Sequence, residues 1–283
     1  MTQYCYVNGR FTPLKKAQVS VQDRGFRFGD GVFETVAVYK GLPYQWDLHM
    51  RRLKCGLQAL EIPFRISDLR QPALQLISKN GLVDATLRIA ISRGVGSIGY
   101  LPTGPADSTL VIEATRRITP PIDPATLWLG EIEKPSLQAL PVQYKIAQGV
   151  NSTLARIQAA KHGCLDSLLL NAHGNICEAG SANVFWQKGD TLFTPALDCG
   201  VLDGTTRSTI LRLSPYKIEQ GSFPLAHLKN ADAMVATNST WQAMPITELR
   251  PNNWQFPDSV ALASALRSVL HKDIEAYAAA HRA

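Results

Sequence analysis

Short apolar runs bounded by turn residues dominate the first third of the sequence. Tyr4–Val7 leads into Asn8-Gly9, a dipeptide typical of β-hairpin turns, and the chain then returns through Arg10 and Phe11. Further strands are predicted at residues 32–39, 87–91 and 109–114. Between residues 48 and 60, by contrast, leucines recur at helical spacing until Pro63 ends the run. The pattern predicts a strand-rich first region with one helix.

A proline-rich segment divides the chain. Three prolines fall within five positions of RRITPPIDPA, residues 116–125, a composition typical of linkers. Beyond it, strands are predicted at 127–132, 167–170, 183–186 and 192–194, and helices from an Asn151 or Ser152 cap to Gly163, after Gly204, and over 259–279. We therefore expect two domains that mix helices and strands, at residues 1–116 and 126–283, joined by a linker at 117–125.

Composition narrows the class of protein. The chain is 45% apolar and 18% charged, and no window approaches the roughly 18 consecutive apolar residues of a membrane span. The N-terminus carries no signal-peptide pattern. Five cysteines are an odd number, widely spaced and without a CxxC pair, which argues against disulfides and zinc and is typical of a reducing compartment. We expect a cytoplasmic protein without a membrane partner.

Charge and motifs exclude several functions. The net charge is +6, but the basic residues are scattered, so we expect no nucleic-acid partner and favour small anionic substrates or a phosphorylated cofactor. No GxxxxGK[ST], strand-linked GxGxxG, HExxH or GxSxG motif is present. The six histidines never fall at ligand spacing, so no metal site is predicted.

Two residues could supply covalent and proton chemistry. Lys145 lies in PVQYKIAQGVNSTLA among apolar and small residues, where a desolvated amine could attack a carbonyl; by itself the segment also fits a surface lysine. Glu178 follows a turn in NICEAGSANVFW, and a buried carboxylate there would need a cationic partner such as a pyridinium nitrogen. An exposed turn glutamate fits that sequence equally well.

Three further segments could bind a phosphate. Arg52 in HMRRLKCGL offers a guanidinium, although it could equally belong to a solvated helix face. Thr205 and Thr206 follow Gly204 at a predicted helix start, where backbone amides point outward. Asn238 and Ser239 in ATNSTW form either a second phosphate-binding turn or a plain polar loop.

Taken in order, these segments resemble the class IV aminotransferase family, the fold-type IV pyridoxal-phosphate enzymes. The likeness runs from about residue 4 to 250, through DRGFRFGDGVFETVAVYKG with the HMRRL helix, KIAQGVNSTLARIQAAKHGC, EAGSANVFW, GVLDGTTRSTI and TNSTWQAMPI. It implies an α/β (α+β) fold of two domains with pyridoxal 5'-phosphate between them, usually in a homodimer. One departure is Gln148, where the family often has asparagine three residues after the lysine.

The resemblance also implies roles for individual residues. Lys145 would form the Schiff base with the cofactor and move protons, and Glu178 would pair with the pyridine nitrogen. The phosphate would be held by Arg52, Thr205, Thr206, Asn238 and Ser239. Candidates for substrate contact are Phe33, Arg93 and Tyr100.

Within the family the chain is most similar to aminodeoxychorismate lyases, which release 4-aminobenzoate and pyruvate for folate synthesis. Thr35 in GVFETV falls where these lyases carry a threonine that is thought to assist proton transfer, and RGVGSIGYLP resembles their substrate loop. Ile98, however, stands where that loop usually has an arginine for a substrate carboxylate; Arg93, Arg27 or Arg24 could substitute. A D-amino acid or branched-chain amino acid transaminase would tolerate Ile98 better, and a non-catalytic cofactor-binding relative is a third alternative.

Overall fold

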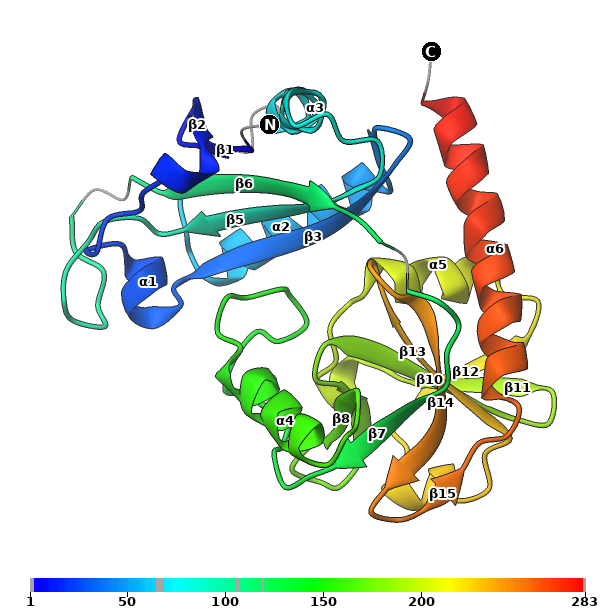
Figure 1. Cartoon of the computed structure of the whole chain (residues 1–283). Coiled ribbons are helices and arrows are strands. Elements are labelled where there is room, and N and C mark those ends of the chain that lie inside the picture. Colours follow the sequence, from blue (N-terminus) through cyan, green and yellow to red (C-terminus); the bar gives the residue numbers. More distant parts are fainter. Residues whose placement is uncertain (1–2, 65–68, 105–106, 119, 282–283) are drawn as a thin grey trace. The chain divides into compact units, whose positions relative to one another are not determined.

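The computed structural model describes residues 3–64, 69–104, 107–118 and 120–281. Its contacts divide the chain into two compact units (Figure 1). The first comprises Met1–Ile118, Tyr144–Gln148 and Ile274–Ala283, and the second comprises Thr119–Gln143 and Gly149–Asp273. Each unit is described below by itself.

The first unit is built on a six-stranded antiparallel sheet. The strand order is β2-β1-β6-β5-β3-β4, with bounds Arg10–Pro13, Tyr4–Val7, Thr109–Arg116, Ala85–Ser92, Gly31–Tyr39 and Leu42–Pro43. The predicted Asn8-Gly9 hairpin joins β1 to β2, and both turn residues have positive φ as a tight turn requires. The strands predicted in this region are therefore confirmed.

The two faces of this sheet differ in what covers them. Val32, Glu34 and Val36 of β3 are buried on one face, beneath α2 (Trp46–Ala59), and α3 (Arg70–Lys79) packs against β1 and β6. On the opposite face Phe33 and Thr35 are only half-buried. We call this second side the open face of the sheet. A short helix, α1 (Arg24–Phe28), precedes β3.

Most strands of the second unit close into a ring. The nine-stranded sheet runs β12-β11-β10-β13-β14-β7-β8-β9, with β15 added to β14, and β9 returns to pair with β10. The bounds are Lys217–Gly221, Thr191–Pro195, Ala182–Lys188, Ala233–Asn238, Gln242–Arg250, Ala125–Leu129, Asp166–Leu170, Ile176–Ala179 and Trp254–Gln255. Val184 and Trp186 of β10 point into the apolar core, because side chains alternate along a strand.

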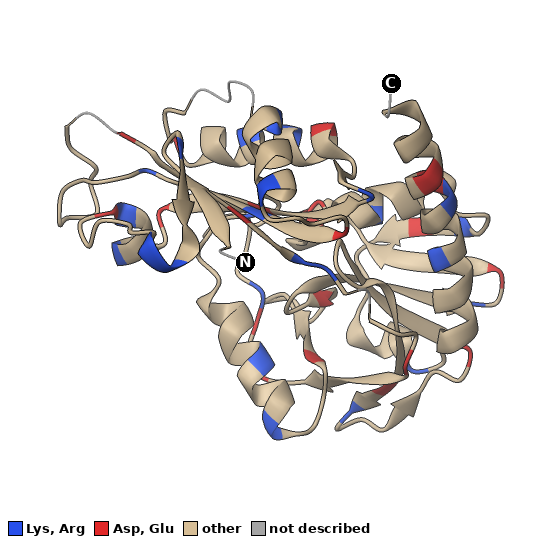
Figure 2. Cartoon of the chain, turned by 45° about the horizontal axis from the view of Figure 1, so that its top comes forward, with Lys and Arg blue, Asp and Glu red and all other residues tan. Residues whose placement is uncertain are grey.

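Three helices accompany this sheet. α5 (Thr205–Leu213) and α6 (Ser259–Ala280) pack on the other side of β10 and β13, around Phe185 and Val235. α4 (Val150–Lys161) packs against β7 and β8. Short 3₁₀ turns lie at Leu14–Lys16, Leu197–Cys199 and Leu225–Leu228. Lysines and arginines are spread over both units (Figure 2).

Several expectations differ from the structure in detail. The helix predicted to begin at an Asn151 or Ser152 cap begins at Val150 instead, with Gly149 at the cap and no side-chain cap bond, so the cap prediction is wrong. Helices α1, of 5 residues, and α3, of 10 residues, were not predicted. The contact division also places Tyr144–Gln148, and hence Lys145, in the first unit rather than with residues 126–283. Residue 119 of the proposed linker lies outside the described residues, and the domain boundaries stay a prediction.

Candidate active site

Lys145 is fixed against the start of β3. Its carbonyl accepts the amide of Phe33 at 2.9 Å, and the amide of Ala147 donates to the carbonyl of Gly31 at 2.8 Å. Ile146 forms an antiparallel bridge with Val32. These bonds make residues 145–147 a short extension of the sheet, so the Lys145 side chain is placed by regular backbone pairing. Its ammonium lies 4.5 Å from the centroid of the Phe33 ring.

The open face around Lys145 carries two of the predicted residues. Phe33 and Thr35 are two positions apart on β3, so both side chains point to this face, roughly 7 Å apart along the strand. Arg88 of β5 lies directly opposite Thr35 in the antiparallel register. Its guanidinium covers the Phe33 ring at 4.0 Å. Lys145, Phe33 and Thr35 are thus brought together, with Arg88 beside them.

A buried charged cluster lies under the opposite face of β3. The Glu34 carboxylate accepts the Nε and Nη2 donors of Arg52 at 2.8 and 2.6 Å, and the Nδ1 of His49 at 2.7 Å. These partners outweigh the desolvation of Glu34 and lower its pKa to about 2. Burial lowers the pKa of His49, so the imidazole is neutral near pH 7 and its Nδ1–H donates to Glu34.

This cluster bears on the predicted role of Arg52. Two of its nitrogens are engaged by Glu34, which orients the guanidinium on α2 and compensates its charge. The alternative interpretation, that Arg52 belongs to a solvated helix face, is wrong, because its side chain is only 8% exposed. The sequence analysis did not predict a role for Glu34 or His49, since neither residue belongs to a motif of recognisable spacing.

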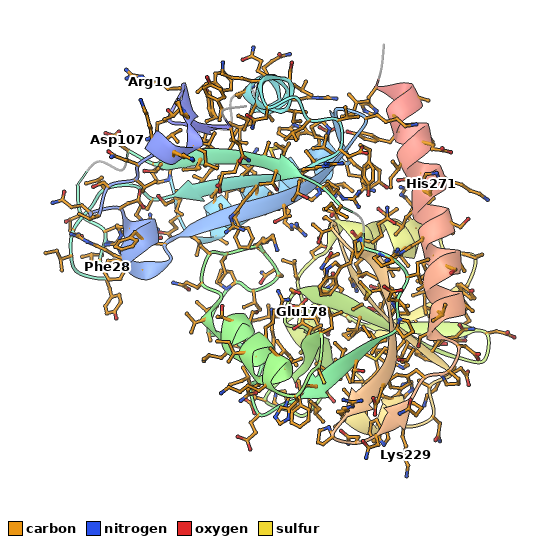
Figure 3. The ribbon with its side chains drawn as sticks, in the orientation of Figure 1. Arg10, Phe28, Asp107, Glu178, Lys229 and His271 are labelled. Atoms are coloured by element: carbon orange, nitrogen blue, oxygen red, sulfur yellow. The ribbon has the colours of Figure 1, made fainter. Side chains whose placement is uncertain are left out.

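In the second unit Glu178 is buried on β9 (Figure 3). Its Oε2 accepts the Nδ2 of Asn183 at 3.1 Å and the amide of Leu202 at 2.9 Å. Lys134 forms an ion pair with Oε1. Glu178 and Asn183 face each other across the β9–β10 hairpin, which fixes the carboxylate. An exposed turn glutamate, the alternative reading, is therefore excluded.

The helix start at Gly204 has the features of an anion site. No side chain caps α5, and the buried Thr205 and Thr206 occupy its first turn. The hydroxyl of Thr205 lies 3.4 Å from that of Ser239, so helix and turn residues meet. Asn238 shapes that turn by accepting the amides of Thr240 and Trp241 at 3.0 and 2.7 Å. Hydroxyls beside an uncapped helix N-terminus suit a phosphate.

The space around residue 204 requires a glycine. A β-carbon at this position would lie 2.0 Å from the Oδ1 of Asn183, whose amide reaches both Glu178 and the carbonyl of Leu202. Gly204→Ala should therefore displace Asn183 and lower the free energy of unfolding by about 1–3 kcal/mol. Urea denaturation measures the loss. Gly99→Ala, where nothing lies within 4 Å of the added carbon and φ is not positive, is the matched control; an equal loss in both variants would contradict the steric account.

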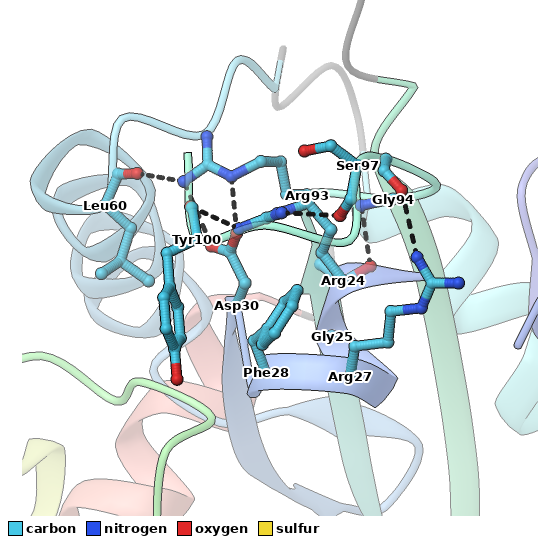
Figure 4. Close-up of polar contacts among 12 residues, drawn as sticks. Arg24, Gly25, Arg27, Phe28, Asp30, Leu60, Arg93, Gly94, Ser97 and Tyr100 are labelled. Carbon is cyan, nitrogen blue, oxygen red and sulfur yellow. Dashed lines mark hydrogen bonds and ion pairs between the residues drawn. The ribbon is translucent and has the colours of Figure 1, made fainter. Parts of the chain in front are cut away.

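Arginines organise the predicted substrate loop, residues 93–102 (Figure 4). Arg24 donates to the carbonyls of Ser97, Gly99 and Tyr100 at 2.7–3.0 Å and to Asp30 at 2.9 Å. Arg93 donates to both oxygens of Asp30 and to the carbonyls of Leu60 and Glu61. These four bonds use four of the five N–H donors of Arg93 and hold its guanidinium against Asp30 and the residues that follow α2.

The remaining loop residues lie at the surface. Tyr100 is 87% exposed, with its ring 5.5 Å from that of Phe28. Arg27 donates to the carbonyl of Gly96 at 3.2 Å. Ile98 is 79% exposed. The predicted substrate contacts of Arg93 and Tyr100 stay predictions.

Comparison with known proteins identifies the class. The family model for class IV aminotransferases matches residues 31–249. An aminodeoxychorismate lyase of Bacillus subtilis is 29% identical over 95% of this chain and 94% of its own length. A Methanocaldococcus jannaschii protein, provisionally named as a branched-chain amino acid aminotransferase, is 31% identical over 86% of this chain and 87% of its own.

The fold agrees with this result. The branched-chain aminotransferase of Thermoproteus uzoniensis superposes with a TM-score of 0.89 at 22% identity, and 98% of each chain is covered. The chain therefore belongs to the class IV aminotransferase family and has the fold-type IV architecture. It is a pyridoxal-phosphate-dependent enzyme, as the sequence predicted. The alternative of a non-catalytic relative is not supported.

The residues present fit that cofactor. The first unit offers a half-buried lysine amine beside an aromatic ring, and the second offers a fixed buried carboxylate together with an uncapped helix start. Amine, carboxylate and phosphate seat are the three groups that pyridoxal phosphate requires. No helix in the described ranges is long and apolar enough to span a membrane. In those same ranges no group of side chains is arranged to hold a metal ion.

Proposed function

We propose that the enzyme is a 4-amino-4-deoxychorismate lyase that releases 4-aminobenzoate and pyruvate in folate synthesis. The bound cofactor supplies an electron sink that acidifies the carbon bearing the amine. The Lys145 amine removes the proton from that carbon, and the Thr35 hydroxyl donates a proton toward the departing enolpyruvyl group. Glu178 holds the ring nitrogen through its carboxylate. Arg52, Thr205, Thr206, Asn238 and Ser239 hold the phosphate.

One observation favours lyase activity over the other activities of the family. Thr35 shares the open face with Phe33, whose ring contacts the Lys145 ammonium. A lyase needs a proton donor beyond the reacting amine, because the leaving group departs with a negative charge, whereas transamination returns its proton through the lysine. The similarity to the Bacillus subtilis lyase over nearly the whole chain supports the same assignment.

Absorption of the bound cofactor tests the reaction class. A lyase regenerates the starting cofactor at the end of each turnover, so the visible band should persist during reaction with aminodeoxychorismate without any 2-oxo acid. A transaminase would lose the band in the presence of its amino acid and recover it only when a 2-oxo acid is added. Bleaching of this second kind by D- or branched-chain amino acids, with no lyase turnover, would overturn the proposal.

Transamination is the second candidate, and Ile98 favours it. This exposed apolar side chain supplies no charge for a substrate carboxylate at the position where the lyase loop usually carries arginine. The similarity to the Methanocaldococcus jannaschii protein fits the same reading. The substrates would be branched-chain or D-amino acids.

We also propose that the enzyme acts as a homodimer in the cytoplasm. Large apolar side chains gather on two adjacent segments of the first unit, residues 21–28 and 94–101, namely Val21, Phe26, Ile98 and Tyr100. The segments are joined by an Asp23–Val95 bridge. Exposed apolar surface of this kind is typical of protein interfaces. Five free cysteines support a reducing compartment.

The role of Glu178 makes a separate prediction. Glu178→Gln keeps the shape of the side chain and can still accept the Leu202 amide, but it removes the charge that favours a protonated ring nitrogen. Turnover should fall by about 10²–10⁴-fold while cofactor remains bound. Steady-state kinetics with a cofactor-binding titration measure both. Glu219→Gln is the control, because Glu219 is an exposed residue that pairs with Lys217. Normal turnover in Glu178→Gln would mean that the Glu178 carboxylate has only a structural role.

A further inference from the structure

A buried carboxylate fastens the β9–β10 hairpin that carries Glu178. Asp166, at the start of β8, is fully buried. Its Oδ1 accepts the amide of Ser167 at 2.8 Å, and its Oδ2 accepts the amide and the hydroxyl of Ser181 at 3.0 and 2.6 Å. A β-carbon on Gly180 would lie 2.6 Å from Oδ1. The turn between β9 and β10 is therefore packed directly against this carboxylate.

The charge of Asp166 is only weakly compensated. Burial raises the pKa of this carboxyl, and the hydrogen bonds from Ser181 and Ser167 oppose the rise. The Arg156 guanidinium is 4.0 Å away and its side chain is 49% exposed, so it contributes little. The geometry nevertheless requires a carboxylate, because both oxygens accept. An amide would offer one acceptor and point N–H groups at the remaining donors.

The turn that Asp166 holds is also a partner of Asn238. The carbonyl of Ser181 accepts the Nδ2 of Asn238 at 3.1 Å. β10 and β13 pair as far as Asn183 and Thr237, so this bond continues the contact beyond the last strand pair. The Oδ1 of Asn238 meanwhile accepts the amides that shape its own turn. Asp166 thus reaches the proposed phosphate-binding turn through one intervening residue.

We propose that Asp166 is a positioning residue for the cofactor phosphate. By holding Ser181 it fixes the carbonyl that orients Asn238, and with it the turn that contains Ser239. The proposal rests on the proposed binding of the phosphate by Asn238 and Ser239, and it is the same for a lyase and a transaminase. Glu178 has its own set of bonds, so the effect is confined to the phosphate end of the cofactor.

Cofactor binding with and without the phosphate tests this role. The holoenzyme is dialysed against decreasing pyridoxal phosphate, and enzyme reloaded with pyridoxal is treated alike; visible absorption gives both dissociation constants. Asp166→Asn should weaken pyridoxal phosphate binding by about 10- to 100-fold and leave pyridoxal binding unchanged. The affinity ratio of the two ligands therefore falls by that factor. Asp84→Asn, an exposed aspartate that accepts the Lys40 amide, should keep the wild-type ratio.

Ser181 carries the same test if Asp166→Asn does not fold. Ser181→Ala keeps the backbone bond to Asp166 but removes the hydroxyl bond, so the ratio should fall by a smaller factor, about 3- to 10-fold. Ser181→Thr retains the hydroxyl and should restore the wild-type ratio. Ser20→Ala, which removes an exposed hydroxyl bonded to the Gln22 amide, is the control and should not change it.

The outcomes separate this inference from the proposed placement of the phosphate. A wild-type ratio in folded Asp166→Asn, or an equal loss of affinity for both ligands, overturns the positioning role. Asn238→Ala should lower the ratio as well. A lowered ratio in Asn238→Ala with a wild-type ratio in Asp166→Asn overturns this inference alone. A wild-type ratio in Asn238→Ala would mean that the phosphate binds elsewhere, and it overturns both.

Discussion

Lys145→Ala should abolish the visible absorption of lysine-bound pyridoxal phosphate and reduce turnover by at least about 10³-fold. The side chain supplies both the covalent link and the proton transfer, so no neighbouring group can replace it. The fold should survive, because the backbone bonds of residue 145 to Phe33 do not involve the side chain. Absorption spectra and steady-state kinetics measure the two losses.

Lys161→Ala is the matched control, since this exposed lysine ends α4. Its spectrum and rate should equal those of the wild type. If the visible band survives in Lys145→Ala, the covalent link must be made by another lysine. The open face would then no longer be supported as the reaction site. Circular dichroism of both variants excludes unfolding as the cause of a lost band.

Glu34→Ala should lower the free energy of unfolding by about 3–5 kcal/mol. Glu34 is fully buried, and its removal leaves the Arg52 guanidinium without the carboxylate that compensates it. Urea denaturation gives the value. Glu61→Ala, at an exposed turn, should change it by less than about 0.5 kcal/mol.

The pH dependence of stability identifies the charge as the cause. The pKa of Glu34 falls from 4.5 in the unfolded chain to about 2 in the folded protein. Its contribution is therefore complete above pH 4.5 and is lost as the pH falls toward 2. Glu34→Gln should lack this part of the acid destabilisation; a variant whose stability follows the wild-type pH curve through that window would contradict the buried ion pair.

Local patterns were enough to predict most of the strands and the longer helices. Runs of β-forming and apolar residues mark β3 and β5, and the Asn8-Gly9 turn marks the first hairpin, because these signals depend on neighbouring residues alone. The closure of the second sheet through β9–β10 could not be predicted in this way, since it depends on pairings between distant segments. The assignment of Tyr144–Gln148 to the first unit has the same origin: the segment pairs with Gly31 and Phe33.

The same distinction between local and long-range signals holds for the residues of the candidate site. Lys145, Glu178 and the Gly204 helix start stand in short segments that resemble a known family, so sequence alone could single them out. Arg88 lies in an ordinary strand, and only the register opposite Thr35 and the contact with Phe33 bring it to the open face. Lys134 reaches Glu178 across 44 positions, a pairing that no local spacing signals.

The stoichiometry of products from aminodeoxychorismate tests the central claim most directly. Purified enzyme loaded with pyridoxal phosphate is given this substrate without a 2-oxo acid, and 4-aminobenzoate is read by fluorescence and pyruvate by a coupled dehydrogenase. A lyase predicts equal amounts of both, increasing over many turnovers and lost in Lys145→Ala. No 4-aminobenzoate, with amino acids consumed only when 2-oxoglutarate is present, would contradict the assignment and make the enzyme a transaminase.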